Sequence, residues 1–345
     1  MSLYTSLFEA PAPGKMALLP KLATYAVLAL WTLVVLFPLY WIVITSFKLP
    51  IDVSTGPFYL PFIDYQPSMH AWNYLFVEQG SDTLRPYLNS LIIASVSTVL
   101  SVIVGAMAAY ALTRITYKPS IGSIVLFIAA IALIVWLVGW QGVDWRIASF
   151  TGLMLFVLAL RGLGARFTHR LGNADILFWI ISQRILPPVV AAIPIYIMFQ
   201  QVGLLDTHVA LIVTYMTVNL PIVVWLLYDF FDGIPREIEE SAALDGASRY
   251  RIFGEIMLPL AKPGLVATTL LVMILSWNEY LLALFLSTVK AQTMPLLVSA
   301  QNATRGPQWW TMSVLIVTMI VPVIAMTLAL QKFIAKGLLL GAVKG

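Results

Sequence analysis

The 345-residue sequence is 60% hydrophobic and 10% charged, and its 20 basic and 16 acidic residues give a formal net charge of +4. Soluble domains carry about 25% charged residues, so this composition excludes a soluble globular protein and indicates an all-α, polytopic membrane protein. The sequence contains no cysteine, which excludes a disulfide framework and a cysteine metal site.

Long apolar runs predict about eight transmembrane helices, because about 20 helical residues cross the hydrocarbon core of about 30 Å. In chain order these runs are residues 22–47, 86–113, 119–143, 147–160, 176–201, 207–228, 263–289 and 311–331. The fourth run has only 14 residues and crosses only if Arg146 and Arg161 extend to the two interfaces. Small residues in the second run, such as Gly105 and Ala106, predict close helix packing.

The distribution of basic residues predicts that both termini are cytoplasmic. With eight spans, fourteen basic residues fall in the segments placed inside and five in the outer loops. Cytoplasmic loops of membrane proteins are enriched in Lys and Arg. If residues 147–160 did not cross, every later segment would change sides, and the basic residues that follow would face outward.

The longest charged segment, residues 237–259, lies between the sixth and seventh runs and predicts two short helices. Pro235 and the glutamates that follow it favour a helix start, and Gly246 breaks the helix because glycine accepts the left-handed conformation. Ser248 is a good N-cap for a second helix, which we expect to end before Pro259.

This charged segment resembles the EAA loop of ABC importer permeases. The matching residues are Glu240-Ser-Ala-Ala-Leu-Asp-Gly-Ala247, then Phe253, then Leu258-Pro259. Further similarity at 185–188, 203–206, 276–280 and the C-terminal tail resembles the second permease of maltose-type sugar-uptake systems. The resemblance covers residues 22–114 and about 177–345. Two departures are Ser241, where the family usually has Ala, and the apolar residues from 119 to about 173, where it has a short connection.

The resemblance implies a division of the chain into segments. These are a cytoplasmic N-terminal segment (1–21), the first two spans with a periplasmic loop (22–118), an inserted hydrophobic hairpin (119–173), a permease core (174–336) that contains the coupling loop (232–260), and a cytoplasmic tail (337–345). The six-helix core thus gains two helices. Because the insert adds an even number of crossings, it leaves the orientation of the core unchanged.

The implied function is that of a transmembrane permease subunit of an ATP-driven importer for a sugar or sugar-like solute, in the bacterial inner membrane. The implied partners are a second, different permease, an ATPase homodimer and a periplasmic solute-binding protein, with no nucleic acid. The chain lacks a Gly-Lys-Ser/Thr phosphate loop. We therefore expect it to be no enzyme and to hold no cofactor, with ATP and Mg bound by the ATPase subunits. The alternatives are an ion-gradient-driven secondary transporter, which inverted repeats would support, and a structural anchor, which leaves the charged segment unexplained.

The resemblance assigns coupling to the ATPase to one set of residues, and an ordinary capped connector is the alternative. The set is Glu240, Ser241, Ala242, Ala243, Asp245, Gly246, Ala247, Phe253, Leu258 and Pro259. We expect Ile252, Phe253, Ile256 and Met257 to form an apolar docking face. The tail residues Gly341, Ala342, Val343, Lys344 and Gly345 are expected to reach between the ATPase subunits, a frayed terminus being the alternative.

Two charges inside apolar runs are candidates for the solute pathway, because ionisable groups in a membrane normally face a cavity or a partner. Arg184 and Glu279 either pair with each other, or one of them lines the pathway, or they extend to an interface. Asn278 and Tyr280 offer a hydrogen-bonding group and a stacking face suited to a sugar, or act as interfacial anchors. The sequence shows no catalytic constellation and predicts no metal site, since its three histidines are isolated.

Overall fold

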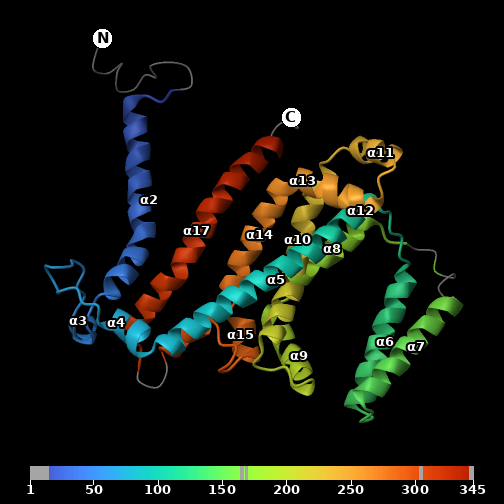
Figure 1. Ribbon diagram of the computed structural model, residues 1–345, viewed down its shortest axis with the longest axis horizontal. Coiled ribbons are helices and arrows are strands. Elements are labelled where there is room, and N and C mark those ends of the chain that lie inside the picture. The colour runs from blue at the N-terminus through green and yellow to red at the C-terminus, as the bar shows by residue number, and fades with distance from the viewer. Residues whose placement is uncertain (1–14, 164–166, 168–169, 303–305, 342–345) are drawn as a thin grey trace. The chain divides into compact units, whose positions relative to one another are not determined.

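The structure is a computed structural model that describes residues 15–163, 167, 170–302 and 306–341, with side chains described up to residue 331. In this part of the chain the regular elements are helices (Figure 1). Six of these helices are long and apolar enough to cross a membrane, and two bent helix pairs raise the number to eight. The prediction of an all-α membrane protein is confirmed, and the predicted eight spans are the upper value of this range.

The chain divides into two compact units, and the long helices α5 (Gly80–Arg114) and α17 (Trp309–Gly341) contribute to both. Unit 1 comprises residues 1–91 and 288–325. Its helices are α2 (Leu18–Thr45), α3 (Pro50–Thr55), α4 (His70–Asn73) with the π-helical turn Tyr74–Glu78, α16 (Met294–Ala300) and the start of α17. Its small core includes Ala71, Leu75 and Met294.

Unit 2 comprises residues 92–287 and 326–345. Its elements are the rest of α5, α6 (Ile121–Gly139), α7 (Trp145–Leu163), α8 (Asn173–Ser182), η3 (Gln183–Ile185), α9 (Pro188–Gln201), α10 (His208–Asp232), α11 (Arg236–Leu244), α12 (Arg249–Arg251), η4 (Ile252–Met257), α13 (Leu258–Leu260), α14 (Lys262–Trp277), α15 (Leu281–Leu286) and the end of α17. Its main core joins α5, α10 and the segment from η4 to α14.

Small residues allow the helices of unit 2 to pack closely, as the sequence predicts. A Cβ atom on Gly105 of α5 would lie 2.4 Å from Val223 Cγ1 of α10. Further along α10, a Cβ atom on Gly264 of α14 would lie 2.3 Å from Phe230 Cγ. Real Cβ atoms essentially never come so close, so glycine lets both α5 and α14 pack tightly against α10.

Two predicted spans are not continuous helices. Residues 176–201 break between α8 and α9, where the two pieces Asn173–Ile185 and Pro188–Gln201 meet at 89°. The cause is Pro187-Pro188, because proline removes an N–H group and clashes with the preceding turn. The sequence predicts one span over residues 263–289, but α14 ends at Trp277 and α15 begins only at Leu281.

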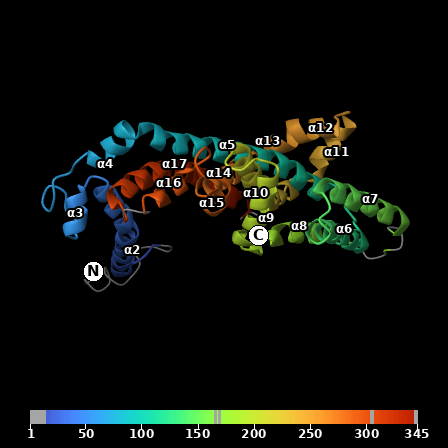
Figure 2. The ribbon, with the colours of Figure 1, turned by 90° about the horizontal axis from the view of Figure 1, so that it is seen from below.

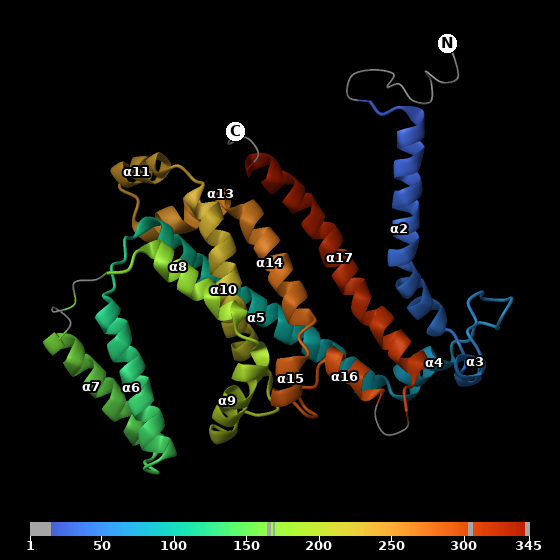
Figure 3. The same cartoon turned by 180° about the vertical axis from the view of Figure 1, so that it is seen from behind.

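The two helices α6 and α7 form a hairpin, and they lie side by side in Figures 1 and 3. The Phe127 and Phe156 rings meet edge to face, with their centroids 5.6 Å apart. The predicted 14-residue run is part of the 19-residue helix α7, which includes Arg146 and Arg161 near its two ends, so its length fits a span whose two arginines extend to the interfaces. Asn173 fastens the base of the hairpin, since it accepts from Tyr117 N and donates to the carbonyls of Leu112 and Ile115. That this hairpin is an insert in a family core stays a prediction.

Candidate functional site

The charged segment folds as a helix-turn-helix beside the C-terminal end of α5 (Figures 1 and 2). Helix α11 begins after Pro235 and ends at Leu244, and Gly246 follows in the left-handed region with φ +83°. The Ser248 hydroxyl caps the next helix by accepting from Arg251 N at 3.3 Å. The predicted helix start, glycine break and serine cap are all present.

The second helix does not end before Pro259 as predicted. It continues through the π-helical turn η4 into α13 and ends at Leu260, before a 77° bend into α14. Pro259 is tolerated because it lies in the first turn of the α-helical piece that follows the π turn, where a missing N–H group costs little.

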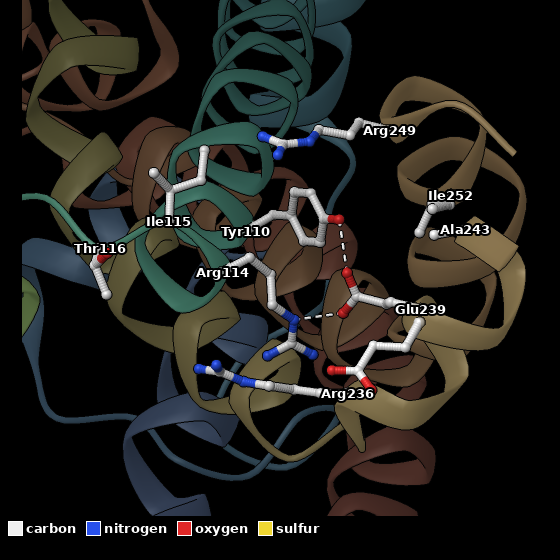
Figure 4. Close-up of a pocket in the computed structure, with 10 residues that line it drawn as sticks. Tyr110, Arg114, Ile115, Thr116, Arg236, Glu239, Ala243, Arg249 and Ile252 are labelled. Atoms are coloured by element: carbon white, nitrogen blue, oxygen red, sulfur yellow. Dashed lines mark hydrogen bonds and ion pairs between the residues drawn. The ribbon is translucent and has the colours of Figure 1, made fainter.

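Glu239 of α11 is the centre of the polar contacts that attach this loop to α5. Its Oε1 atom forms an ion pair with Arg114 Nε, and its Oε2 atom accepts from the Tyr110 hydroxyl at 2.8 Å (Figure 4). The Arg114 and Glu239 side chains are only 10% and 13% exposed. A buried carboxylate with a partner at each of its two oxygen atoms has little freedom to move. Helix α11 is therefore fixed against the end of α5.

Arg114 also joins the loop to the end of α10. Its Nη2 atom donates to the carbonyls of Phe231 at 3.0 Å and Ile234 at 2.9 Å. A second arginine, Arg236 at the start of α11, donates to Thr113 O at 3.2 Å. Thr113 and Phe231 lie in the last turns of α5 and α10, and Ile234 follows α10. The two guanidinium groups therefore donate to carbonyls at helix C-terminal ends, where positive charge is favourable.

A cavity of about 460 Å³ opens between α5, α11 and α12. Its polar lining includes three arginines and two glutamates, namely Arg114, Arg236, Arg249, Glu239 and Glu240 (Figure 4). Tyr110 and Ile252 form part of its apolar wall. The loop therefore does not lie flat on the membrane helices but leaves an accessible, charged recess beside its anchor.

The residues predicted to couple to an ATPase fall into two groups by exposure. Those that face outward are Glu240, Ser241, Ala243, Asp245, Gly246 and Pro259. Those that are half-buried and pack against the core of unit 2 are Ala242, Ala247, Phe253 and Leu258. One loop thus carries an outer face that is free for contact and an inner face that is part of the fold.

The predicted apolar docking face turns inward, which corrects the sequence-based expectation. Ile252 and Met257 are buried, and Phe253 and Ile256 pack against the same core. The Phe253 ring lies 5.0 Å from that of Tyr110 and 6.3 Å from that of Phe231, centre to centre. The reason is that η4 leads directly into α14, so its apolar side has α5 and α10 beside it and is covered by the chain itself.

Two exposed apolar side chains were missed by reasoning from the sequence. Leu244 and Tyr250 are each 89% exposed, on either side of the turn at Gly246. An apolar residue before Asp-Gly and an aromatic one between two arginines were the available signals. The role of Glu239 was also missed: the motif begins at Glu240, and one residue on a helix turns the side chain by about 100°, onto another face.

Comparison with known proteins identifies the family. The model of the binding-protein-dependent transport system inner membrane component matches residues 156–339, which is more than half of the chain. The chain belongs to this family. It is therefore a multi-pass inner-membrane permease subunit of an ABC importer, a system in which ATPase activity lies in separate subunits and which works with a binding protein.

Individual relatives match nearly the whole permease. A probable ABC transporter permease protein, y4oR of Sinorhizobium fredii, is 29% identical over 322 residues, covering 91% of this chain and 95% of the relative. The trehalose/maltose transport system permease protein MalG of Thermococcus litoralis is 29% identical over 323 residues, covering 92% and 94%. A crystal structure of a bacterial ABC transporter involved in the import of the acidic polysaccharide alginate shares the fold, with a TM-score of 0.58, 20% identity and 90% and 95% coverage. These matches give no support to an ion-gradient-driven transporter.

The predicted pathway residues of this permease lie at the two helix breaks. Arg184 is in η3, between α8 and α9; it is exposed, and its Nη1 atom donates to Val218 O of α10 at 3.2 Å. Glu279 lies between α14 and α15, and its Oε1 atom accepts from Leu282 N at 2.9 Å. Among the described side chains, these two charges form no ion pair with each other, so the predicted alternative in which they pair is not adopted.

Asn278 and Tyr280 flank Glu279 in the same break. Both are exposed, and the Asn278 side chain donates to Ile274 O at 2.8 Å, where it caps the end of α14. The backbone carbonyl of Glu279 accepts from the Tyr215 hydroxyl at 3.3 Å.

In the tail, Gly341 is the last residue of α17, and residues 342–345 lie outside the described part of the chain.

Proposed function

We propose that this permease imports a sugar or sugar-like solute and that its loop at 232–260 transmits movement of the ATPase subunits to the membrane helices. The observation that carries the proposal is the anchoring of α11 to the end of α5 through Glu239, Arg114 and Tyr110. A loop that transmits force must be fixed on one side and free on the other. This loop has both properties.

The outer face of the loop suits contact with an ATPase subunit. Leu244 and Tyr250 expose large apolar surfaces beside the charged groups of Glu240 and Asp245. Exposed apolar side chains ringed by polar ones are typical of protein–protein contact sites. Gly246 sets the angle between the two short helices, and Ser241 and Ala243 are small enough to let them enter a groove.

The inner face of the loop suits transmission into the membrane. Ala242, Ala247, Phe253 and Leu258 pack on the core that joins α5, α10 and α14. Because a closely packed core transmits displacement rather than absorbing it, pulling on α11 moves these helices together. Arg114 adds direct hydrogen bonds from α5 to the end of α10.

The partners in this proposal are a second, different permease, an ATPase homodimer and a periplasmic binding protein. ATP and Mg bind in the ATPase subunits, and this chain holds no cofactor. Both termini are cytoplasmic, as the excess of basic residues on that side supports, and the tail at 341–345 reaches between the ATPase subunits. Residues 119–173 are an inserted hairpin in the permease core.

The solute pathway in this proposal passes the two helix breaks. Interrupted helices are typical of solute sites in transporters, because their free backbone groups and polar side chains meet there. Arg184 and Asn278 are exposed at these breaks, and Glu279 and Tyr280 lie beside Asn278. A sugar is the proposed solute because the Thermococcus litoralis relative is named for transport of trehalose and maltose.

The test is uptake in proteoliposomes that contain this chain, its second permease and its ATPase subunits, with the loaded binding protein outside. Maltose and trehalose are the first probes of a sugar panel. We expect uptake of a sugar that requires internal ATP and is unaffected by collapsing ion gradients. The proposal is contradicted if an ion gradient drives uptake without ATP. It is also contradicted if ATP drives the uptake of none of the sugars in the panel.

Contact with the ATPase is tested by cross-linking, since the chain has no native cysteine. Leu244→Cys is expected to cross-link to an ATPase subunit in the assembled importer. Trp140→Cys, similarly exposed but in the turn between α6 and α7, is the control and is expected not to cross-link. Equal cross-linking of both variants, or of neither, argues against the proposed contact.

A further inference from the structure

The loop that follows α3 in unit 1 ends in an exposed apolar turn that the proposed function does not use. Leu60, Phe62 and Ile63 form this turn, which we call the apolar tip, and Phe62 and Ile63 are 75% and 78% exposed. Phe62 has φ +66°, in the left-handed region that is costly for a bulky residue. A strained backbone that exposes large apolar side chains to solvent needs a reason outside the loop itself.

The loop lies beside the C-terminal part of α2 (Figures 1 and 3). The Tyr40 hydroxyl of α2 donates to Tyr59 O at 2.6 Å, and the Tyr59 ring lies 6.0 Å from that of Phe37. Since α2 ends at Thr45, these contacts lie about 7 to 12 Å before its end. Two more bonds hold the loop: Lys48 Nζ donates to Phe58 O, and the Tyr65 hydroxyl donates to Ile44 O at 3.0 Å.

The position along α2 places the apolar tip at the depth of the bilayer surface. Helix α2 begins close to Lys21, and its uncharged part starts at Leu22. About 20 residues cross the hydrocarbon core, so the opposite boundary falls near Trp41. Tyr40, Trp41 and Tyr59 are therefore where tyrosine and tryptophan gather at a membrane interface. The apolar tip follows directly after Tyr59.

The backbone of the loop is already suited to a medium without water. The Asp64 carboxylate accepts from Tyr59 N at 2.8 Å and Leu60 N at 2.9 Å. Phe62 N donates to Tyr65 O, and the N–H groups of residues 63 and 64 donate to Leu60 O. Residue 61 is proline and has no N–H group. Every backbone donor from 59 to 64 thus has a partner in the chain, which is required of backbone in contact with lipid.

We propose that the apolar tip inserts into the lipid bilayer at the C-terminal end of α2 and anchors this loop to the membrane surface. Leu60, Phe62 and Ile63 enter the boundary between the headgroups and the acyl chains. Asp64 stays charged behind them: hydrogen bonds from two backbone N–H groups, and to a smaller extent the charge of Lys48, lower the pKa of its carboxyl group. The inference does not depend on the solute or on which side of the membrane this end of α2 faces.

The absence of native cysteine allows a direct measurement of depth. The Phe62→Cys and Ile63→Cys variants are assembled into the importer in lipid vesicles and labelled with a nitroxide. Importers that contain the parent chain are labelled in the same way, and their signal is subtracted to correct for labelling of partner subunits. Collisions with oxygen, which concentrates in lipid, and with a water-soluble nickel chelate are compared. We expect a several-fold excess of oxygen over nickel collisions at both positions. Gln66→Cys, an exposed polar position nearby, is expected to favour nickel.

Two results would overturn the proposal. If nickel collisions are as frequent at positions 62 and 63 as at position 66, the apolar tip lies in water. Exclusion of both reagents places it under a protein, either the second permease or the binding protein. Adding Asp64→Ala to the Ile63→Cys variant removes the acceptor of two backbone N–H groups. We expect collisions with nickel at position 63 to rise. ATPase-linked uptake is the folding control, because a collapsed fold would also lose it.

Discussion

At the scale of single residues, the neighbouring acids Glu239 and Glu240 have different environments. Glu239 is almost buried in its contacts with Arg114 and Tyr110, whereas Glu240 is exposed at the edge of the cavity. A sequence motif reports which residues recur together, but it does not report which of two adjacent carboxylates faces the chain's own helices. The structure assigns anchoring to Glu239 and leaves Glu240 free for a partner.

Glu239→Gln should loosen the loop, because it leaves the buried Arg114 guanidinium without its counter-charge. We expect the loop to lose roughly 1–3 kcal/mol of local stability. Breaking a fully buried ion pair typically costs about 3–5 kcal/mol, and the loss is smaller here because both side chains keep some exposure. Limited trypsin digestion at Arg249 and Arg251 measures this, and cleavage should be faster in the variant. Glu240→Gln is the matched control, and equally fast cleavage of both variants would contradict the assignment.

Two glycines of the same loop provide a second test at the residue scale. Gly246 has φ +83° and Gly254 does not lie in the left-handed region, yet a Cβ atom at either position meets nothing within 4 Å. Gly246→Ala should therefore destabilise the loop by about 1–2 kcal/mol through backbone strain alone. Gly254→Ala should be neutral or stabilise by up to about 1 kcal/mol, as expected in a helix.

The measurement for these glycine variants is the rate of the same tryptic cleavage in the solubilised protein, together with its thermal unfolding. Faster cleavage in Gly246→Ala only is the expected pattern. If Gly254→Ala loosened the loop as much, the turn would not depend on the left-handed conformation at Gly246.

At the scale of helices, the sequence predicts positions well and continuity poorly. Apolar runs located every long helix, and the Pro187-Pro188 pair in the fifth run explains the 89° break between α8 and α9. The break after Trp277 could not be predicted, since residues 278–280 contain no proline or glycine. It is held by tertiary contacts: the Tyr215 hydroxyl binds Glu279 O, and Asn219 donates to the Ser276 hydroxyl at 3.0 Å.

The close approach of α5 to α10 gives a prediction at this scale. Gly105→Ala places a methyl group where Val223 already lies, and we expect a loss of about 1–3 kcal/mol from overpacking. Gly162→Ala in α7 is the matched control, because nothing lies within 4 Å of its Cβ position. Thermal unfolding in detergent should show a lower midpoint for Gly105→Ala only. Equal midpoints would mean that α5 and α10 do not pack this closely.

At the scale of the whole molecule, composition and charge were enough to predict the class, and the match at 240–259 was enough to predict the family, which the comparisons confirm. The direction of individual side chains in the coupling loop was beyond reach. Phe253 and its apolar neighbours read equally well as a docking face or as core, and only the path of the chain from η4 into α14 decides between the two. The anchoring contacts of Arg114 join residues more than 100 positions apart, which no local pattern encodes.

The central claim is that this permease couples ATP hydrolysis to transport through a loop fixed by Glu239. The most direct test is the number of ATP molecules hydrolysed per solute imported by the reconstituted importer, with Glu239→Gln compared with the parent chain. We expect hydrolysis to continue while uptake falls by roughly tenfold, the effect of losing about 1.4 kcal/mol of anchoring. An unchanged ratio in a variant whose loop is demonstrably cleaved faster would contradict the account.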